Sequence, residues 1–250
     1  MPLPLETLLI LLVLAVTLIL LVAQVRRVRG QGLQLVASKP FAVLARQAGE
    51  AIENGRQVHV GLGRGSLHQG HLPASTAAQE ALDALAKRSS LGGIPPQVTL
   101  GDATLLPIAQ ESIQSAYVQA NRLAQYPIDS AQFVAPSNAP YAYAVGSGDL
   151  IRHGEIGSSA VLGHIGVEMA FMAEAGARAN VVQVLGSDDP LGMAIATAYT
   201  PHVLLGETML ATGAALHKRP FQIASLLVQN LWRTALILAI LVFAILRLLG

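Results

Sequence analysis

Two long apolar segments bracket the chain, Leu5–Ala23 near its start and Leu231–Leu249 near its end. Glu6 is the one charged residue in the first segment, whose length matches the roughly 20 residues that a helix needs to cross a bilayer. In the second segment, Arg233 and Arg247 lie close enough to the ends for their side chains to reach the membrane interfaces. We therefore expect two transmembrane helices.

Each segment has an alternative interpretation. A cleaved signal peptide places its basic residues before a shorter apolar stretch, whereas Arg26, Arg27 and Arg29 follow this one. Retention as an anchor is therefore favoured over cleavage after Gln24. The alternative for the last segment is a buried core helix, which would need apolar neighbours on every side.

Positive charge is concentrated on the inner flanks of both segments. Arg26, Arg27 and Arg29 follow the first segment, and Lys218 and Arg219 precede the second. Because Lys and Arg are enriched on the cytoplasmic side of membranes, we expect the middle of the chain in the cytoplasm and both termini outside. This describes a two-span protein of the cell inner (plasma) membrane, and the lack of cysteine agrees with a reducing compartment.

Between the spans, short apolar runs alternate with longer stretches in which apolar residues recur at helical spacing. The runs predict strands at 56–60, 97–100, 132–134, 159–163, 180–185 and 202–205. The other stretches predict helices at about 38–52, 75–88, 104–125, 139–153, 167–177, 191–199 and 207–217, the fourth interrupted by glycines. This alternation is typical of an α/β fold, here a Rossmann-like three-layer domain with a mostly parallel sheet and helices on both faces.

We accordingly divide the chain into three parts. Residues 1–25 form an N-terminal transmembrane helix, residues 26–220 a cytoplasmic α/β domain, and residues 221–250 an amphipathic lead-in followed by a C-terminal transmembrane helix. The order of the strands in the sheet does not follow from the sequence.

Composition narrows the possible functions. The chain has 16 basic and 15 acidic residues. Its net charge of +1 is far from the large positive charge that is typical of nucleic-acid-binding proteins. The basic residues beside the membrane point instead to lipid headgroups as partners. Aromatic residues make up only 4% of the chain, and its many alanines and glycines favour close packing of elements or of subunits.

Polar residues follow several predicted strands, where ligands of parallel sheets collect. The positions to inspect there include Pro136–Asn138, Glu168, Ser187 and Asp189. A nucleotide or other anion bound at these strand ends would be held by residues among Gly61, Gly63, Arg64, Gly65, Ser66, Asp102, His164, Asp188 and Glu207.

The glycine-rich and histidine-containing stretches also have structural interpretations. The loop Gly61–Ser66 could bring N–H groups and an arginine to an anion. It matches neither the dinucleotide fingerprint nor a P-loop, so a connector that needs positive φ angles is favoured. His59, His68 and His71 lie close in sequence but fit no dedicated zinc pattern.

The remaining candidates are weighed against helix capping. His164 and Glu168 stand four residues apart, a spacing that allows one shared helix face. Acid–base or metal chemistry would need them to converge with Asp188, Asp189 and Glu207. Capping is favoured, because the two glutamates fit the first turns of helices and the aspartates precede a proline. Without cysteine or a Gly-x-Ser-x-Gly motif, no nucleophile stands out, and we expect no catalytic residue, metal site or cofactor.

The order of these features resembles an uncharacterised bacterial family of two-span membrane proteins with a domain of unknown function. The resemblance covers the whole chain and implies a membrane-tethered cytoplasmic domain, with no functional residue to carry over. Besides the N-terminal anchor with its basic flank, the stretches that carry it are Gly55–Gly63, Tyr141–Gly146, Glu174–Asn180, Gly186–Asp189 and Leu205–Glu207.

Two functions follow as hypotheses. The favoured one is a non-enzymatic, membrane-anchored scaffold whose cytoplasmic domain assembles into a homo-oligomer, with other membrane proteins as further partners. The alternative is a membrane-tethered sensor or enzyme that binds a nucleotide or anion at the strand ends. Transport is disfavoured, because two spans without a charged residue in the membrane interior offer no pathway.

Overall fold

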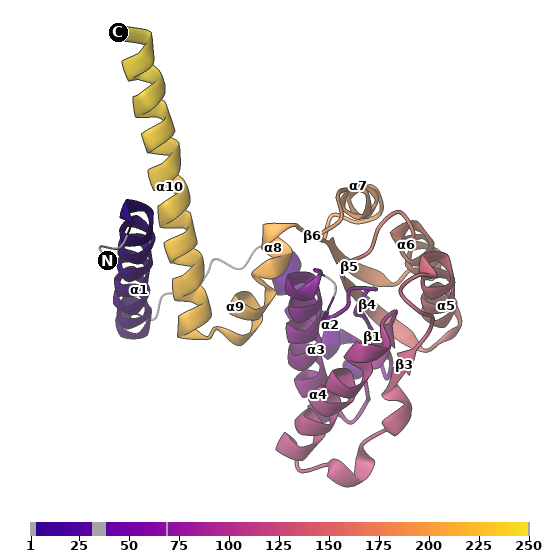
Figure 1. Ribbon diagram of the computed structural model, residues 1–250. Coiled ribbons are helices and arrows are strands. Elements are labelled where there is room, and N and C mark those ends of the chain that lie inside the picture. The colour runs from indigo at the N-terminus through magenta and orange to yellow at the C-terminus, as the bar shows by residue number, and fades with distance from the viewer. Residues whose placement is uncertain (1–3, 32–38, 69, 250) are drawn as a thin grey trace. The chain divides into compact units, whose positions relative to one another are not determined.

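The computed structural model describes residues 4–31, 39–68 and 70–249 of the chain (Figure 1). It divides into two compact units. A helical unit combines Met1–Val36 with His217–Gly250, and an α/β unit comprises Ala37–Leu216. Ser38, the expected start of the first helix of the domain, lies outside the described residues.

The helical unit consists of α1 (Leu5–Gln31) and α10 (Pro220–Leu249), which pack against each other. Both are long and apolar enough to cross a membrane, over Glu6–Gly30 and Pro220–Leu248. The apolar window of α10 is not buried, which argues against a core helix. Because α10 is continuous from Pro220, the expected lead-in is an extension of the apolar helix and not a separate element.

The α/β unit contains one open sheet of six parallel strands in the order β3-β2-β1-β4-β5-β6. Its strands are β1 (Gln57–Gly61), β2 (Gln97–Leu100), β3 (Ala131–Phe133), β4 (Ile156–Gly163), β5 (Val182–Ser187) and β6 (Val203–Leu205). Its helices are α2 (Lys39–Glu53), α3 (Leu72–Gly92), α4 (Leu106–Gln119), α5 (Pro140–His153), α6 (Met169–Arg178), α7 (Pro190–Tyr199), α8 (Glu207–Leu210) and α9 (Thr212–His217). The predicted α/β, Rossmann-like architecture is confirmed.

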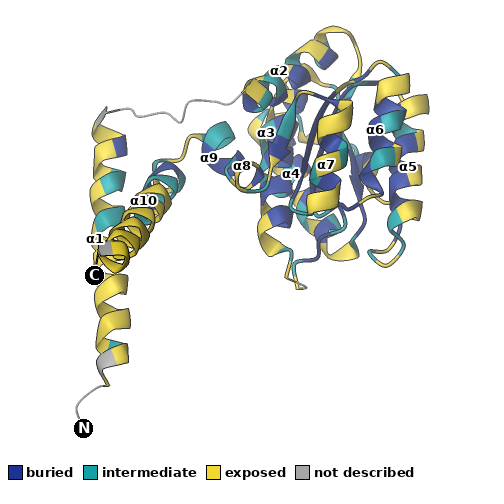
Figure 2. Ribbon diagram, turned by 90° about the horizontal axis from the view of Figure 1, so that it is seen from above, coloured by how far each residue is buried: buried dark blue, intermediate teal, exposed yellow. Residues whose placement is uncertain are grey.

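Helices cover both faces of the sheet (Figure 2). Leu44, Leu82 and Ile113 of α2, α3 and α4 belong to one buried cluster, which includes Val58 and Val60 of β1. A second cluster joins α5, α6 and α7 to the opposite face. The middle strands β1 and β4 are buried along nearly their whole length, which explains why they are mostly apolar or small.

Three predicted helices differ in detail. The helix expected at 104–125 is split into the 3-10 turn η1 (Ala103–Leu105), α4 and the 3-10 turn η2 (Leu123–Gln125). Asn121, with φ 57°, follows α4 and leaves the helical conformation there. The helix 139–153 is uninterrupted, and the helix 207–217 is divided into α8 and α9. A further 3-10 turn, η3 (Ile128–Ser130), precedes β3.

Gly192 in α7 allows this helix to approach the loop after β4. A Cβ atom at this position would overlap the carbonyl oxygen of Ile165 and lie 3.0 Å from Ser187 Oγ. We therefore expect Gly192→Ala to lower the free energy of unfolding by about 2 kcal/mol, because a backbone atom must move to make room. Urea unfolding of the full-length protein in detergent, followed by circular dichroism, measures this change.

Gly49 in α2 provides the matched control. A Cβ atom there meets nothing within 4 Å, so Gly49→Ala is expected to raise stability by about 0.5–1 kcal/mol through its better helix propensity. Equal effects of the two substitutions would contradict the proposed close approach at Gly192.

Candidate functional site

The strand order reverses between β1 and β4, which lie side by side in the middle of the sheet. From β1 the chain proceeds outward to β2 and β3, and from β4 outward to β5 and β6. In open parallel sheets a crevice forms at the carboxyl ends of two such strands and is the usual place for a ligand. The loops after β1, β4 and β5 are therefore the candidate site.

Three backbone N–H groups of the glycine-rich loop after β1 are bonded inside the protein. Leu62 N donates to Thr99 O at 2.9 Å, Gly63 N to the Tyr143 hydroxyl at 3.1 Å, and Arg64 N to His164 O at 3.0 Å. A phosphate cradle needs such groups to face a ligand. Side chains would therefore have to supply most of the contacts to an anion here.

Glycine at position 63 is required by geometry. Gly63 has φ 71°, and a Cβ atom there would lie 3.0 Å from both the N and the O of His164. Position 65 also has little room for a side chain, since a Cβ atom there would lie 2.5 Å from Ser75 Oγ. The favoured interpretation of this loop, a connector with a positive φ angle, agrees with these contacts.

Arg64 and the buried Glu168 form a largely buried ion pair that connects three loops. Arg64 Nε donates to Glu168 Oε1 at 2.5 Å, and Arg64 Nη1 donates to Ser137 O at 3.0 Å. Gly166 N also donates to Glu168 Oε1, at 2.9 Å. The Glu168 side chain is 3% exposed. Glu168 stands at the N-cap position of α6, as its expected place at a helix start requires, but it makes no side-chain hydrogen bond to the helix, and its carboxylate pairs with Arg64 instead.

Asp188 contacts two histidines. His164 Nδ1 lies 2.8 Å from Asp188 Oδ1, and His71 Nδ1 lies 3.5 Å from Asp188 Oδ2. The two imidazole rings stack, with centroids 3.5 Å apart and an interplanar angle of 19°. His164 follows β4, Asp188 follows β5 and His71 immediately precedes α3. From the sequence, the convergence of His164 with Asp188 is only a requirement for chemistry, capping is favoured instead, and His71 is not placed with them.

Other strand-end residues have local structural roles. Asp102 accepts from Thr104 N at 2.9 Å and from the Thr104 hydroxyl, which caps η1. Asp189 caps α7, accepting from Leu191 N at 2.8 Å and Gly192 N at 3.2 Å, as expected for a residue before Pro190. These contacts leave Asp102 and Asp189 outside the group around Asp188.

The remaining positions predicted for the site are Gly61, Ser66 and Glu207, which are not part of the group formed by His71, His164 and Asp188. Gly61 is the last residue of β1, and Ser66 is buried, with its Oγ accepting from His68 N at 3.1 Å. Glu207 begins α8 after β6, an edge strand. Among the described residues, the groups close enough to share a metal ion do not include Glu207.

Two buried polar residues behind the site were not recognised from sequence. Tyr143 is fully buried, accepts from Gly63 N and donates to Thr99 O at 3.5 Å, and its burial raises the pKa of the hydroxyl. His59 bridges two neighbouring strands, with Nδ1 2.9 Å from Ser159 Oγ and Nε2 2.9 Å from Thr99 Oγ1. Burial lowers the pKa of His59 to about 3. From the sequence, His59 is weighed only as part of a histidine cluster with His68 and His71, and not for a role inside the sheet.

Comparison with known proteins identifies one relationship. A family model described as a domain of unknown function, DUF6754, matches residues 4–250. No curated protein and no solved structure matches the chain. The match includes both apolar helices and the whole α/β unit, as the resemblance noted from the sequence implied.

Proposed function

Because the chain belongs to DUF6754, a family of unknown function, we propose its function from its own structure: it is a membrane-anchored scaffold that self-associates through its α/β domain. The observation that carries this proposal is an exposed apolar surface on α5 and α6. Tyr141, Val145 and Phe171 there are 54%, 52% and 48% exposed. Exposed clusters of aromatic and aliphatic side chains mark interaction surfaces when polar residues surround them.

The surface is continuous across the two helices. Tyr141 and Phe171 make an edge-to-face contact, with ring centroids 5.9 Å apart. Val145 and Phe171 line a shared groove of about 220 Å³. Gly148 lets the helices pack closely beneath it, since a Cβ atom there would lie 3.3 Å from Ala175 Cβ.

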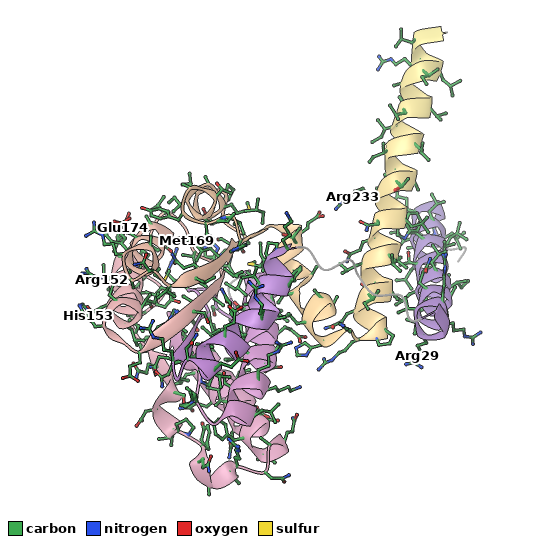
Figure 3. All side chains as sticks on the ribbon, turned by 180° about the vertical axis from the view of Figure 1, so that it is seen from behind. Arg29, Arg152, His153, Met169, Glu174 and Arg233 are labelled. Atoms are coloured by element: carbon green, nitrogen blue, oxygen red, sulfur yellow. The ribbon has the colours of Figure 1, made fainter. Side chains whose placement is uncertain are left out.

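The charges around this groove suit a second copy of the same surface. Asp149 and Glu174 supply negative charge, and Arg152 and Arg178 supply positive charge. Arg152, His153 and Glu174 project from this side of the domain (Figure 3). Glu174 pairs with Arg178 and Asp149 with His153 within the chain, and the equal numbers of acidic and basic residues around the groove leave no net charge to repel a second copy.

Anchoring strengthens such a contact. We infer that α1 and α10 span the inner (plasma) membrane with the α/β unit in the cytoplasm and both termini outside, because the basic residues flank the inner ends of both spans. Confinement to the plane of the bilayer raises the effective concentration of neighbouring copies. The lipid bilayer and further membrane proteins are the expected partners, and nucleic acid is not.

Replacing Val145 by glutamate tests the proposed interface. We expect the wild-type protein to be larger than a monomer in detergent and to form cross-linked oligomers in intact membranes. Val145→Glu should weaken self-association at least about tenfold, equivalent to about 1.4 kcal/mol. The mass of the extracted particle and the yield of cross-linked species measure the effect.

Leu191 on α7 gives the matched control, because it is an aliphatic residue at least as exposed as Val145, 60% against 52%. Leu191→Glu should leave the oligomer intact. The absence of native cysteine allows single cysteines at positions 145 and 191 to be cross-linked without background. A wild-type monomer in both detergent and membranes would refute self-association, and equal behaviour of the two variants would refute the α5–α6 surface.

A second candidate function is a membrane-tethered sensor or enzyme that binds a nucleotide or anion at the strand ends. The observation that favours it is the position of Arg64 and His164 at the point where strand order reverses. A nucleotide at about 100 times its dissociation constant would add roughly 2.7 kcal/mol of stability. A thermal-shift panel of nucleotides distinguishes this candidate from a scaffold, which should show no shift.

A further inference from the structure

We propose that His71, His164 and Asp188 form a binding site for a divalent transition-metal ion of the Zn²⁺ type. Their ligating atoms all lie within 4.8 Å of one another. The three residues come from separate segments, before α3, after β4 and after β5, and meet at the crevice beside the middle of the sheet. This site is independent of the proposed scaffold surface on α5 and α6.

The donor set determines which cation fits. Two imidazole nitrogens and one carboxylate oxygen suit zinc and neighbouring transition metals, whereas Mg²⁺ and Ca²⁺ prefer oxygen ligands. Two histidines with one carboxylate are also the ligand set of a class of zinc sites that keep a fourth position open. The side chains of His71, His164 and Asp188 are 39%, 19% and 31% exposed, so an ion and a fourth ligand can reach them.

A His–Asp hydrogen bond alone does not account for this geometry. His164 makes such a bond to Asp188, but the 3.5 Å separation between His71 Nδ1 and Asp188 Oδ2 exceeds normal hydrogen-bond length. His71 is instead stacked on His164 with its Nδ1 on the side of the carboxylate. A metal ion lies in the plane of each imidazole that binds it, so for both rings to hold one ion with the carboxylate, His71 would turn out of this stack while its Cα atom stays in place.

The surrounding structure holds the three residues in place. Ser187 Oγ donates to Ile165 O at 2.7 Å and accepts from Asp189 N at 3.0 Å, which fixes the turns on either side of His164 and Asp188. Gly65 leaves the room that the histidines occupy, since a Cβ atom there would lie 3.2 Å from His71 Cβ and 3.3 Å from His164 Cβ. Such positioning by outer residues is typical of metal sites.

Local charge also favours a cation. Asp188 contributes a negative charge, and the neighbouring Arg64 is neutralised by its ion pair with Glu168. The positive charge of Arg64, in the loop after β1, is therefore already balanced by Glu168. The carboxylate of Asp188 remains to attract the metal ion.

Titration of the full-length protein in detergent, purified without a histidine tag and stripped with a chelator, tests the site. We expect one Zn²⁺ to bind per chain and to raise the melting temperature. Co²⁺ should give the visible absorption bands of low-coordinate cobalt bound to nitrogen and oxygen. Asp188→Asn keeps the shape of the side chain and should weaken Zn²⁺ binding at least about 100-fold, more than the loss typical of outer-shell changes.

A second pair in the same chain supplies the control. His153 Nδ1 lies 2.8 Å from Asp149 Oδ1, the same separation as in the His164–Asp188 pair. The metal-ligating groups found among the described residues do not include this pair. Asp149→Asn should leave Zn²⁺ affinity unchanged, and His71→Ala should reproduce the loss seen with Asp188→Asn. Failure of the wild-type protein to bind Zn²⁺ or Co²⁺, or equal affinity in wild type and Asp188→Asn, would overturn the proposal.

Discussion

Replacing Glu168 by glutamine is expected to lower the free energy of unfolding of the α/β unit by about 3 kcal/mol or more. The substitution removes the negative charge that compensates Arg64, whose side chain is only 18% exposed. A buried charge that loses its partner also loses the attraction that offset its desolvation. Urea unfolding of the full-length protein in detergent at neutral pH measures the change.

The exposed Glu174–Arg178 pair is the control for this prediction. It has a similar separation, 2.6 Å between Arg178 Nε and Glu174 Oε1, but its side chains are 65% and 43% exposed. Because water already screens exposed ion pairs, Glu174→Gln should have a much smaller effect than Glu168→Gln. Similar losses for the two variants would contradict the assignment of Arg64–Glu168 as a buried structural pair.

The second large effect concerns pH and comes from His59. The pKa of His59 is about 3 in the folded protein, against an ordinary value of 6.5, because burial disfavours the charged imidazole. The unfolded chain therefore binds a proton between these two values that the folded protein does not bind. This contribution to stability is fully present above pH 6.5 and is lost as the pH falls toward 3. At pH 5 it amounts to a loss of about 2 kcal/mol relative to pH 7.

Comparison with a non-titrating variant isolates this contribution. His59→Gln retains hydrogen-bonding groups but cannot take up the proton, so its stability should fall less steeply between pH 6.5 and pH 5. The expected difference approaches one proton, or about 1.4 kcal/mol per pH unit. His153→Gln, at an exposed position, controls for the loss of a histidine. If the wild type and His59→Gln show parallel pH profiles, His59 does not remain neutral in the folded protein.

Neither of these positions could be assigned from sequence. His59 is one of two polar residues within Gln57–Gly61, and its two hydroxyl partners come from β2 and β4, which are far away along the chain. Glu168 fits the start of α6, so a helix cap was the simplest local interpretation. The ion pair with Arg64 forms only when the loops after β1 and β4 lie together.

Local patterns were sufficient where the underlying physics is local. Asp188 or Asp189 was expected to cap the helix that begins at Pro190, and Asp189 does so, because capping depends on a residue and its next few neighbours. The exit from α4 near Asn121 was missed, since a helical pattern continued beyond it. Asn adopts the left-handed conformation more readily than most residues, but its position alone does not identify a helix end.

The sequence by itself determined two apolar segments of membrane-spanning length and an alternation of strands and helices between them. Both follow from the hydrophobicity of neighbouring residues, because a single helix or strand buries a surface that its own side chains define. Only the tertiary structure decided that β1 and β4 are neighbours and that His71 joins His164 and Asp188. The tertiary structure also directed the N–H groups of Leu62, Gly63 and Arg64 to partners inside the protein. These features depend on contacts between distant segments, which local periodicity does not encode.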